Sequence, residues 1–311
     1  MKKRILCGIL LICTWFVFSA CNVQPATPTH DPDKLLIVTT NFPPYDFARQ
    51  ITGEDAEVIM LLSPGEESHS FEPTPKDIMT LAEADLFILG GGESDAWAKK
   101  LMDSAELDAS KAFMMMDYVD MHAEDADEKH DHSAHYAYDE HVWTSPRNAT
   151  IICTKLSERL AEIDAENAEN YRQNFADYLQ ELALLDAEFT KITTGAARKT
   201  IVFADRFPFR HLADTYGLSY YSAFPGCSAE TEPDAATMSF LIDTVKKEQI
   251  PAVFYTEHSD RKIADAVTEA TGAKQLLMHS CHTLTKEESE RGETYISIMK
   301  QNAEALKEAL S

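Results

Sequence analysis

Basic residues are scarce in this chain. Its 28 lysines and arginines stand against 52 aspartates and glutamates, which gives a formal net charge of −24. Such an acidic excess disfavours nucleic acids and anionic membrane surfaces as partners, whereas a cationic ligand is compatible with it. Cysteine is scarce too, with only six in 311 residues. A fold built on disulfides is therefore excluded.

Long apolar runs are absent after the N-terminus. Ile5–Phe18 follows three basic residues and is shorter than the roughly 20 residues of a membrane-spanning helix, so we expect residues 1–20 to be a secretion signal. The motif FSAC, which ends at Cys21, resembles a bacterial lipobox with phenylalanine in place of the usual leucine. This predicts a lipid on Cys21, a flexible tether over 21–33 and an extracytoplasmic protein anchored to the membrane, or a periplasmic one without the lipid.

The remaining length suits two cores, and apolar runs alternate with helical patterns as in parallel α/β proteins. We predict two lobes, over 34–165 and 195–311, each with a four-stranded, mainly parallel sheet flanked by helices. The predicted strands are Leu35–Thr40, Val58–Leu62, Leu86–Leu89, Ala112–Met116, Thr200–Asp205, Ser219–Phe224, Ala252–Glu257 and Gln275–Ser280.

Two helices are predicted between the lobes. Ser145 and Pro146 form a helix start, with an N-cap followed by proline in the first turn. Further on, apolar residues recur at spacings of four and three, which predicts one rigid helix over 166–194 joining the lobes. The residues of this stripe are Tyr171, Phe175, Tyr178, Leu182, Leu185, Phe189 and Ile192.

Side chains that bind metals follow several predicted strands. His69, His141, Asp205, Glu257 and His279 all lie at or just after the carboxyl end of a strand. Ligands gather at this edge of parallel sheets. The positions of these residues at strand ends therefore support the hypothesis of a metal site between the lobes.

Two motifs resemble the N-lobe signatures of the metal-specific solute-binding proteins of ABC importers. They are HSFEPTP, which begins at His69, and DEHVWTSPRNA, in which His141 is the histidine. The resemblance covers essentially the whole mature chain. It implies two α/β lobes joined by a long helix, a metal held in the cleft by both histidines, and delivery to an ABC importer permease.

The C-lobe departs from this family pattern. Members commonly place a third histidine at the end of the first C-lobe strand and an acid at the end of the last, whereas this chain has Asp205 and His279 there. The predicted ligands are therefore His69, His141, Asp205 and His279, with Glu257 and His282 in reserve. Three imidazoles and one carboxylate suit tetrahedral Zn²⁺; Mn²⁺ or iron, which favour more oxygen ligands, are the alternatives.

The segment HAEDADEKHDHSAH also favours zinc, because zinc-specific relatives carry a similar insertion ahead of the second ligand histidine. Its histidines, which would collect metal weakly, are His122, His130, His132 and His135. Two cysteines, Cys227 and Cys281, follow C-lobe strands and could form a disulfide outside the cytoplasm.

A closed shell of four ligands leaves no place for a reactive water, so we expect no enzyme. The competing hypothesis is a secreted zinc-dependent hydrolase with Glu257 as base, but no HExxH motif supports it. A role in cell adhesion could coexist with transport, and a monomer is the default for a tethered carrier.

Overall fold

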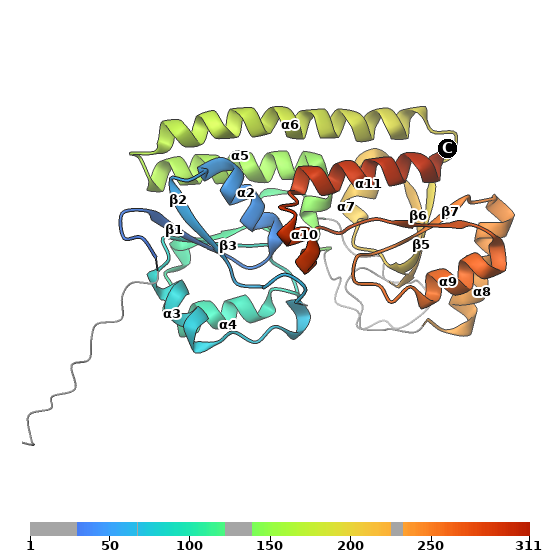
Figure 1. Ribbon diagram of the computed structural model, residues 1–311, viewed down its shortest axis with the longest axis horizontal. Coiled ribbons are helices and arrows are strands. Elements are labelled where there is room, and N and C mark those ends of the chain that lie inside the picture. Colours follow the sequence, from blue (N-terminus) through green and yellow to red (C-terminus); the bar gives the residue numbers. More distant parts are fainter. Residues whose placement is uncertain (1–29, 67, 122–138, 225–232) are drawn as a thin grey trace, which may run out of the picture. The chain divides into compact units, whose positions relative to one another are not determined.

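The computed structural model describes residues 30–311 except 67, 122–138 and 225–232, and leaves out the side chain of His69. The predicted signal, Cys21, Cys227 and the histidines of the 122–135 segment thus lie outside the described residues. Lys34–Ser311 forms one compact unit. Its elements are shown in Figure 1.

The first sheet contains β1 (Leu35–Thr39), β2 (Ala56–Met60), β3 (Leu86–Leu89) and β4 (Ala112–Met114). These strands are all parallel and lie in the order β2-β1-β3-β4. The helices that connect them are α2 (Phe42–Thr52), α3 (Pro75–Glu83) and α4 (Ala96–Ser104), with 3₁₀ turns η1 (Ser68–Ser70), η2 (Ala109–Lys111) and η3 (Met115–Tyr118). We call this part, residues 34–121, the N-lobe.

The second sheet repeats the arrangement. Its strands are β5 (Thr200–Arg206), β6 (Ser219–Phe224), β7 (Ala252–Tyr255) and β8 (Lys274–Leu277), parallel and in the order β6-β5-β7-β8. The helices are α7 (Arg210–Tyr216), α8 (Ala235–Glu248), α9 (Lys262–Thr271) and α10 (Lys286–Glu290). We call residues 200–290 the C-lobe. Two four-stranded parallel sheets flanked by helices confirm the predicted fold class among the described residues.

Three long helices lie beside the sheets. They are α5 (Pro146–Ile163), which follows the 3₁₀ turn η4 (Val142–Thr144), then α6 (Ala168–Gly195) and the C-terminal α11 (Tyr295–Leu310). In Figure 1, α6 runs alongside both α5 and α11, and it also contacts α2 and α7. The predicted joining helix is thus present as α6, and its apolar stripe is buried at Tyr171, Tyr178, Leu182, Leu185 and Phe189.

Local signals explain where the helices begin. Thr74 forms a capping box with Asp77 ahead of α3, and Ser145 accepts a hydrogen bond from the amide of Asn148 at the start of α5. Several strands end earlier than predicted. In β8 the amide of Met278 still bonds to Tyr255, but that of His279 bonds to the Asn302 side chain, so the ladder stops there.

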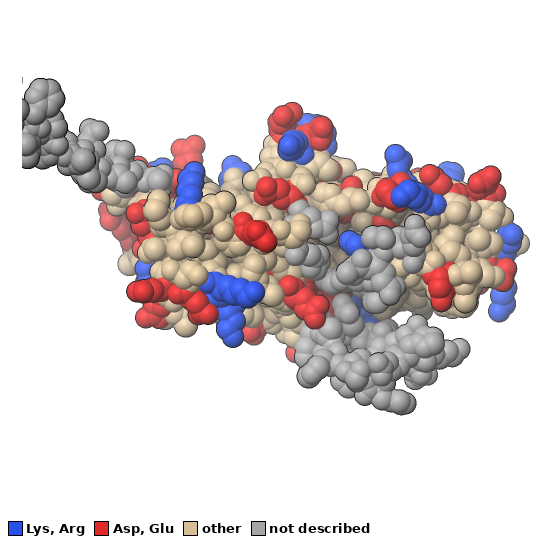
Figure 2. Space-filling model, turned by 90° about the horizontal axis from the view of Figure 1, so that it is seen from below, with Lys and Arg blue, Asp and Glu red and all other residues tan. Residues whose placement is uncertain are grey.

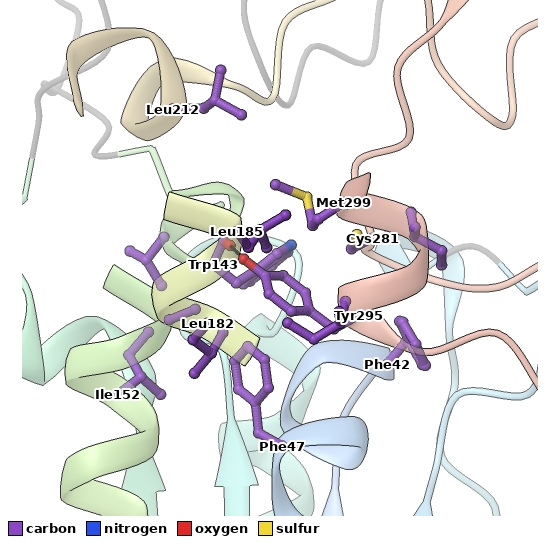
Figure 3. Packing of buried hydrophobic residues seen from close by; sticks show 14 of the residues in the cluster. Phe42, Phe47, Trp143, Ile152, Leu182, Leu185, Leu212, Cys281, Tyr295 and Met299 are labelled. Carbon is purple, nitrogen blue, oxygen red and sulfur yellow. Dashed lines mark hydrogen bonds between the residues drawn. The ribbon is translucent and has the colours of Figure 1, made fainter. Parts of the chain in front are cut away.

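The largest hydrophobic cluster joins the two lobes. Figure 3 shows Phe47 of α2, Trp143 of η4, Leu182 of α6 and Tyr295 of α11 packed around one another. Each lobe also has a smaller hydrophobic cluster of its own, between its sheet and the helices on the other face of that sheet. A shared core of this kind resists independent rotation of the lobes, because it would have to open as they separate.

Charged side chains are spread over the surface. On the face shown in Figure 2, acidic and basic residues are interspersed over a mostly uncharged surface. Within residues 30–311, apart from the positions left out, no helix is both long and apolar enough to cross a membrane.

Asp46 on α2 is a buried carboxylate, 3% exposed, that bonds to α11. Its Oδ2 accepts the amide hydrogen of Tyr295 at 3.0 Å, and its Oδ1 accepts a hydrogen bond from Gln50 at 3.3 Å. Burial raises the pKa of Asp46 to about 6, although these hydrogen bonds oppose the shift. Ionisation of the buried Asp46 carboxyl therefore lowers the stability of the folded state, although the bond from Tyr295 favours the charged form.

We expect Asp46→Asn to remove part of the pH dependence of stability. Between about pH 4 and pH 6, folded protein holds a proton on Asp46 that the unfolded chain releases, so the free energy of unfolding falls as pH rises. At about 1.4 kcal/mol per unit, this amounts to about 3 kcal/mol. Urea denaturation of both proteins across this range measures the difference. A slope that is the same in both would contradict the prediction.

Candidate metal site

Three side chains meet between η4 and the loop after β8. The possible ligand atoms of Glu140, His141 and His282 all lie within 4.8 Å of one another. Among the described residues, no other group of three histidines, cysteines or acids is this close. A tetrahedral zinc shell needs about 3.4 Å between its ligand atoms, so small side-chain movements would bring these atoms to that spacing.

His141 is held in one orientation by Asp139. Its Nδ1 lies 2.8 Å from Oδ1 of Asp139, and its backbone amide donates to the same oxygen at 2.9 Å. A proton on Nδ1 would satisfy this contact and would leave the Nε2 lone pair for a metal. Burial alone would raise the pKa of Asp139, but the contacts with His141 hold it below its usual value.

The same acid ties the site to α7. Its Oδ2 accepts the amide hydrogen of Arg210 at 3.2 Å, and its backbone carbonyl accepts a hydrogen bond from Nε2 of His211 at 2.9 Å. Asp139 is 1% exposed. One carboxylate thus orients His141 and attaches the start of η4 to the C-lobe.

The rings of the site pack edge to face. The centroid of His141 lies 5.6 Å from that of His282, and the Trp143 centroid lies 5.5 and 5.4 Å from the two. Trp143 also donates its Nε1 hydrogen to the carbonyl of Ser280 at 2.8 Å. The indole therefore separates both imidazoles from the core and restricts their movement.

Glu140 was not among the residues predicted from the sequence. It is 2% exposed, and its Oε2 accepts the amide hydrogen of Ser94 at 2.9 Å. Burial would raise its pKa, but the nearby His141, the bond to Ser94 and His282 hold it below its usual value. The signal in the sequence was its position next to His141 in the motif. An acidic residue at that position is easily taken for a solvated surface residue.

Gly92 makes room for Glu140. Its φ is +84°, and a Cβ atom there would lie 2.2 Å from Oε2 of Glu140. We expect Gly92→Ala to lower the free energy of unfolding by about 1–3 kcal/mol more than Gly272→Ala does. Gly272 is a matched control because its φ is +77° and nothing lies within 4 Å of its added Cβ. Urea denaturation compares the two, and equal losses would show that Glu140 is not displaced.

Two of the predicted ligands already have protein partners. Asp205 accepts the amide of Arg206 at Oδ1, and the amide and hydroxyl of Thr256 at Oδ2. His279 accepts the Cys281 amide at Nδ1, 2.9 Å away, and its Nε2 lies 3.2 Å from Oε2 of Glu288. The structure thus brings together His141 and the reserve residue His282, but places Asp205 and His279 in other contacts.

The other predicted site residues lie nearby or outside the described residues. His69 lies in η1, between β2 and α3, but its side chain is not described. Glu257 bonds to Ser280 next to the cluster. Cys281 is a buried free cysteine, and its predicted partner Cys227 lies outside the described residues, so the disulfide stays a prediction.

The family model of the zinc-uptake complex component A, periplasmic (ZnuA), matches residues 37–309 of this chain. The high-affinity zinc uptake system protein ZnuA of Bacillus subtilis is 33% identical over 312 residues, 97% of each chain. The zinc-binding lipoprotein AdcA of Streptococcus pneumoniae is 31% identical over 313 residues, which cover 98% of this chain but only 61% of AdcA.

A solved structure shows the same fold. The crystal structure of the Zn(II)-bound ZnuA-like domain of Streptococcus pneumoniae AdcA aligns with a TM-score of 0.74 at 30% identity, covering 89% of this chain and 99% of that domain. The arrangement of two lobes is therefore the one seen in a zinc-bound relative.

Proposed function

Because the chain belongs to the family of the zinc-uptake complex component A, we propose that it captures zinc outside the cytoplasm and delivers it to an ABC importer. The family consists of solute-binding proteins rather than enzymes. The observation that carries the proposal is the cluster of Glu140, His141 and His282, whose ligand atoms lie within 4.8 Å of one another.

We propose His69, His141 and His282 as the imidazole ligands and Glu140 as the carboxylate ligand. His69 is included because its motif resembles the first ligand signature of the family. His282 takes the place of His279, and Glu140 that of Asp205, because His282 and Glu140 lie in the cluster with His141 whereas His279 and Asp205 do not.

The donor set fits zinc as cargo. Three neutral nitrogens and one carboxylate are a common tetrahedral set, whereas manganese and iron(II) favour more oxygen atoms. Zinc bound here would neutralise the charge of Glu140 and accept the Nε2 lone pair that Asp139 leaves on His141. A shell filled by protein ligands would leave no coordinated water, which disfavours the alternative of a zinc-dependent hydrolase.

Attachment and delivery complete the proposal. Cys21 would carry the lipid, and residues 21–33 would let the binding unit reach a permease in the same membrane. The histidines of the 122–135 segment would collect zinc ahead of the site. The relative AdcA carries the name lipoprotein, which supports the anchor.

Metal content and competition test the proposed cargo. We expect the chain from residue 22 onward, purified without an affinity tag, to hold close to one zinc per molecule and to retain it against an excess of manganese. Equilibrium dialysis followed by elemental analysis measures both. A preference for manganese would overturn zinc as the cargo, and failure to bind either metal would overturn the metal-uptake role.

A further inference from the structure

The loop His279–His282, which we call the ligand loop, presents His282 to the proposed site. It follows β8, and its four consecutive backbone amides all bond to side chains rather than to backbone carbonyls. The pairs are His279 N with Asn302 Oδ1 (2.8 Å), Ser280 N with Glu257 Oε2 (2.9 Å), Cys281 N with His279 Nδ1 (2.9 Å) and His282 N with Ser280 Oγ (3.1 Å).

Two carbonyls of the ligand loop accept hydrogen bonds from outside the C-lobe. That of Ser280 accepts from Nε1 of Trp143 at 2.8 Å, and that of His282 accepts from the amide of Phe42 at 3.3 Å. The loop thus bonds through its amides to the C-terminal part of the chain and through these carbonyls to η4 and α2. The position of His282 depends on both sets of bonds.

The loop has a conformation that its own sequence does not favour. Cys281 has φ of +61° and is fully buried. Residues with a side chain rarely adopt this conformation, and when they do the surrounding contacts impose it. Here those contacts are the hydrogen bonds that the backbone amides of Ser280, Cys281 and His282 donate to side chains.

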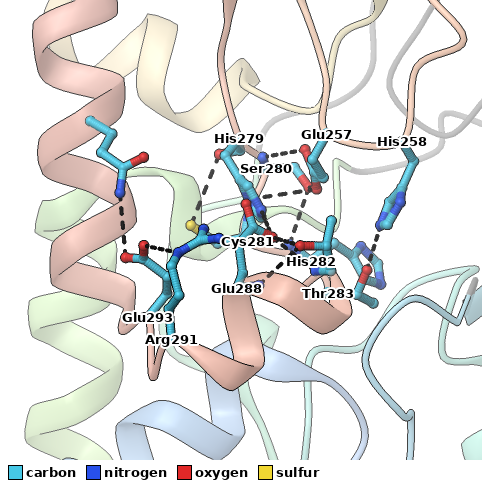
Figure 4. Close-up of polar contacts among 12 residues, drawn as sticks. Glu257, His258, His279, Ser280, Cys281, His282, Thr283, Glu288, Arg291 and Glu293 are labelled. Carbon is cyan, nitrogen blue, oxygen red and sulfur yellow. Dashed lines mark hydrogen bonds and ion pairs between the residues drawn. The ribbon is translucent and has the colours of Figure 1, made fainter.

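Glu257 is the centre of this network. Its side chain is 3% exposed; Oε2 accepts the amide of Ser280, and Oε1 accepts the hydroxyl of Ser280. That hydroxyl oxygen in turn accepts the amide of His282. A single chain of hydrogen bonds therefore leads from a buried carboxylate to the backbone of a proposed ligand, as Figure 4 shows.

His279 and Glu288 fix the other side of the loop. Nε2 of His279 lies 3.2 Å from Oε2 of Glu288, and the same oxygen accepts the amide of Thr285 at 2.8 Å, which caps α10. Oε1 of Glu257 lies 3.7 Å from Nδ1 of His279. These groups explain why His279 is buried without being in the metal cluster.

We infer that Glu257 is a positioning residue that sets the place of His282 without binding the metal. The inference rests on the proposed function, because it requires His282 to be a ligand. Loss of the Glu257 charge should weaken the hold on Ser280 and let the backbone of His282 move. All of the proposed ligands would remain, but the fold would no longer fix the distances between their ligand atoms.

The test is Glu257→Gln, with Glu293→Gln as a matched control. Glu293, just before α11, also accepts a bond from a serine hydroxyl, that of Ser297, but its other partners are Gln301 and Arg291 rather than the ligand loop. For Glu257→Gln we expect zinc affinity to fall about 10- to 100-fold, as for other groups that orient metal ligands, with one zinc per molecule retained. Competition with a chromophoric chelator measures this.

The visible spectrum of the Co²⁺-loaded protein separates positioning from a general loss of stability. We expect Glu257→Gln to keep an intense tetrahedral spectrum with shifted bands, and Glu293→Gln to match the wild type in spectrum and affinity. Loss of one-to-one binding or of the tetrahedral spectrum would make Glu257 a ligand and overturn the inference. Unchanged affinity and bands would also overturn it, whereas absence of metal binding by the wild type would overturn the proposed function instead.

If Glu257→Gln does not fold, a second variant tests whether Glu257 positions His282. Ser280→Ala removes the hydroxyl between Glu257 and the amide of His282 but leaves every charge in place. We expect affinity to fall about 10-fold with the same band shift. Wild-type affinity and bands in Ser280→Ala would overturn the inference.

Discussion

Zinc binding is expected to fall by more than 100-fold when His282 is replaced by alanine. Removal of one imidazole would leave three of the four proposed ligands and an open position, and a lost ligand costs more than the roughly 10- to 100-fold typical of groups that only orient one. Isothermal titration in the presence of a competing chelator measures the change in affinity. The free energy of unfolding of the metal-free protein, measured alongside, shows whether the fold is intact.

His258→Ala is the control for this prediction. His258 lies on the neighbouring loop after β7, is exposed, and bonds to Thr283 rather than to the cluster. We expect it to bind zinc as the wild type does. Zinc retained by His282→Ala but lost by His279→Ala would return the ligand role to His279 and remove His282 from the proposed site.

The second large effect is expected on stability, from Trp143→Ala. Trp143 is 1% exposed and lies in the cluster shared by both lobes; its Nε1 bonds to Ser280 and its carbonyl accepts the Tyr295 hydroxyl. Truncation of a buried aromatic residue to alanine costs about 3–5 kcal/mol. We expect a loss of that size in the free energy of unfolding, measured by urea denaturation.

Two comparisons identify the source of that loss. Trp143→Phe keeps most of the packing but leaves the Ser280 carbonyl without its donor, so we expect about 1–3 kcal/mol. Trp97→Ala, at a half-buried tryptophan that packs at a tilt against Phe71 in the smaller N-lobe cluster, should cost less than Trp143→Ala. A larger loss from Trp97→Ala would mean that the shared cluster is not the main source of stability.

The fold could be predicted because its signals are local. Apolar runs of strand length mark the buried sheets, and a stripe at helical spacing marks α6, whose observed bounds are Ala168–Gly195. Thr74 and Ser145 both act as the helix caps that their residue types favour. The return of α11 beside α6 could not be predicted, because nothing near residue 295 indicates which distant surface that helix covers.

The site could be predicted only in outline. Both His141 and His279 were predicted as ligands because they lie near strand ends. That argument locates a ligand only to within two or three positions of the sequence, so it cannot distinguish His279 from His282. The choice between His279 and His282 depends on the partners that hold the ligand loop, Glu257, Glu288 and Asn302, which lie 9 to 23 residues from the loop residues they bond and give no local signal in the sequence. The ligand set stays a prediction until binding is measured.

The bond between Asp46 and Tyr295 has a consequence for the order in which the protein matures. Its two ends are 249 residues apart in the sequence. If the chain is exported as proposed, α2 would bury this carboxylate without its backbone partner until the last helix has been translocated, so the contact between α2 and α11 would form only after the rest of the chain has crossed the membrane. A chain truncated before α11 would lack this contact, and we expect proteases to cleave it faster than the full-length chain.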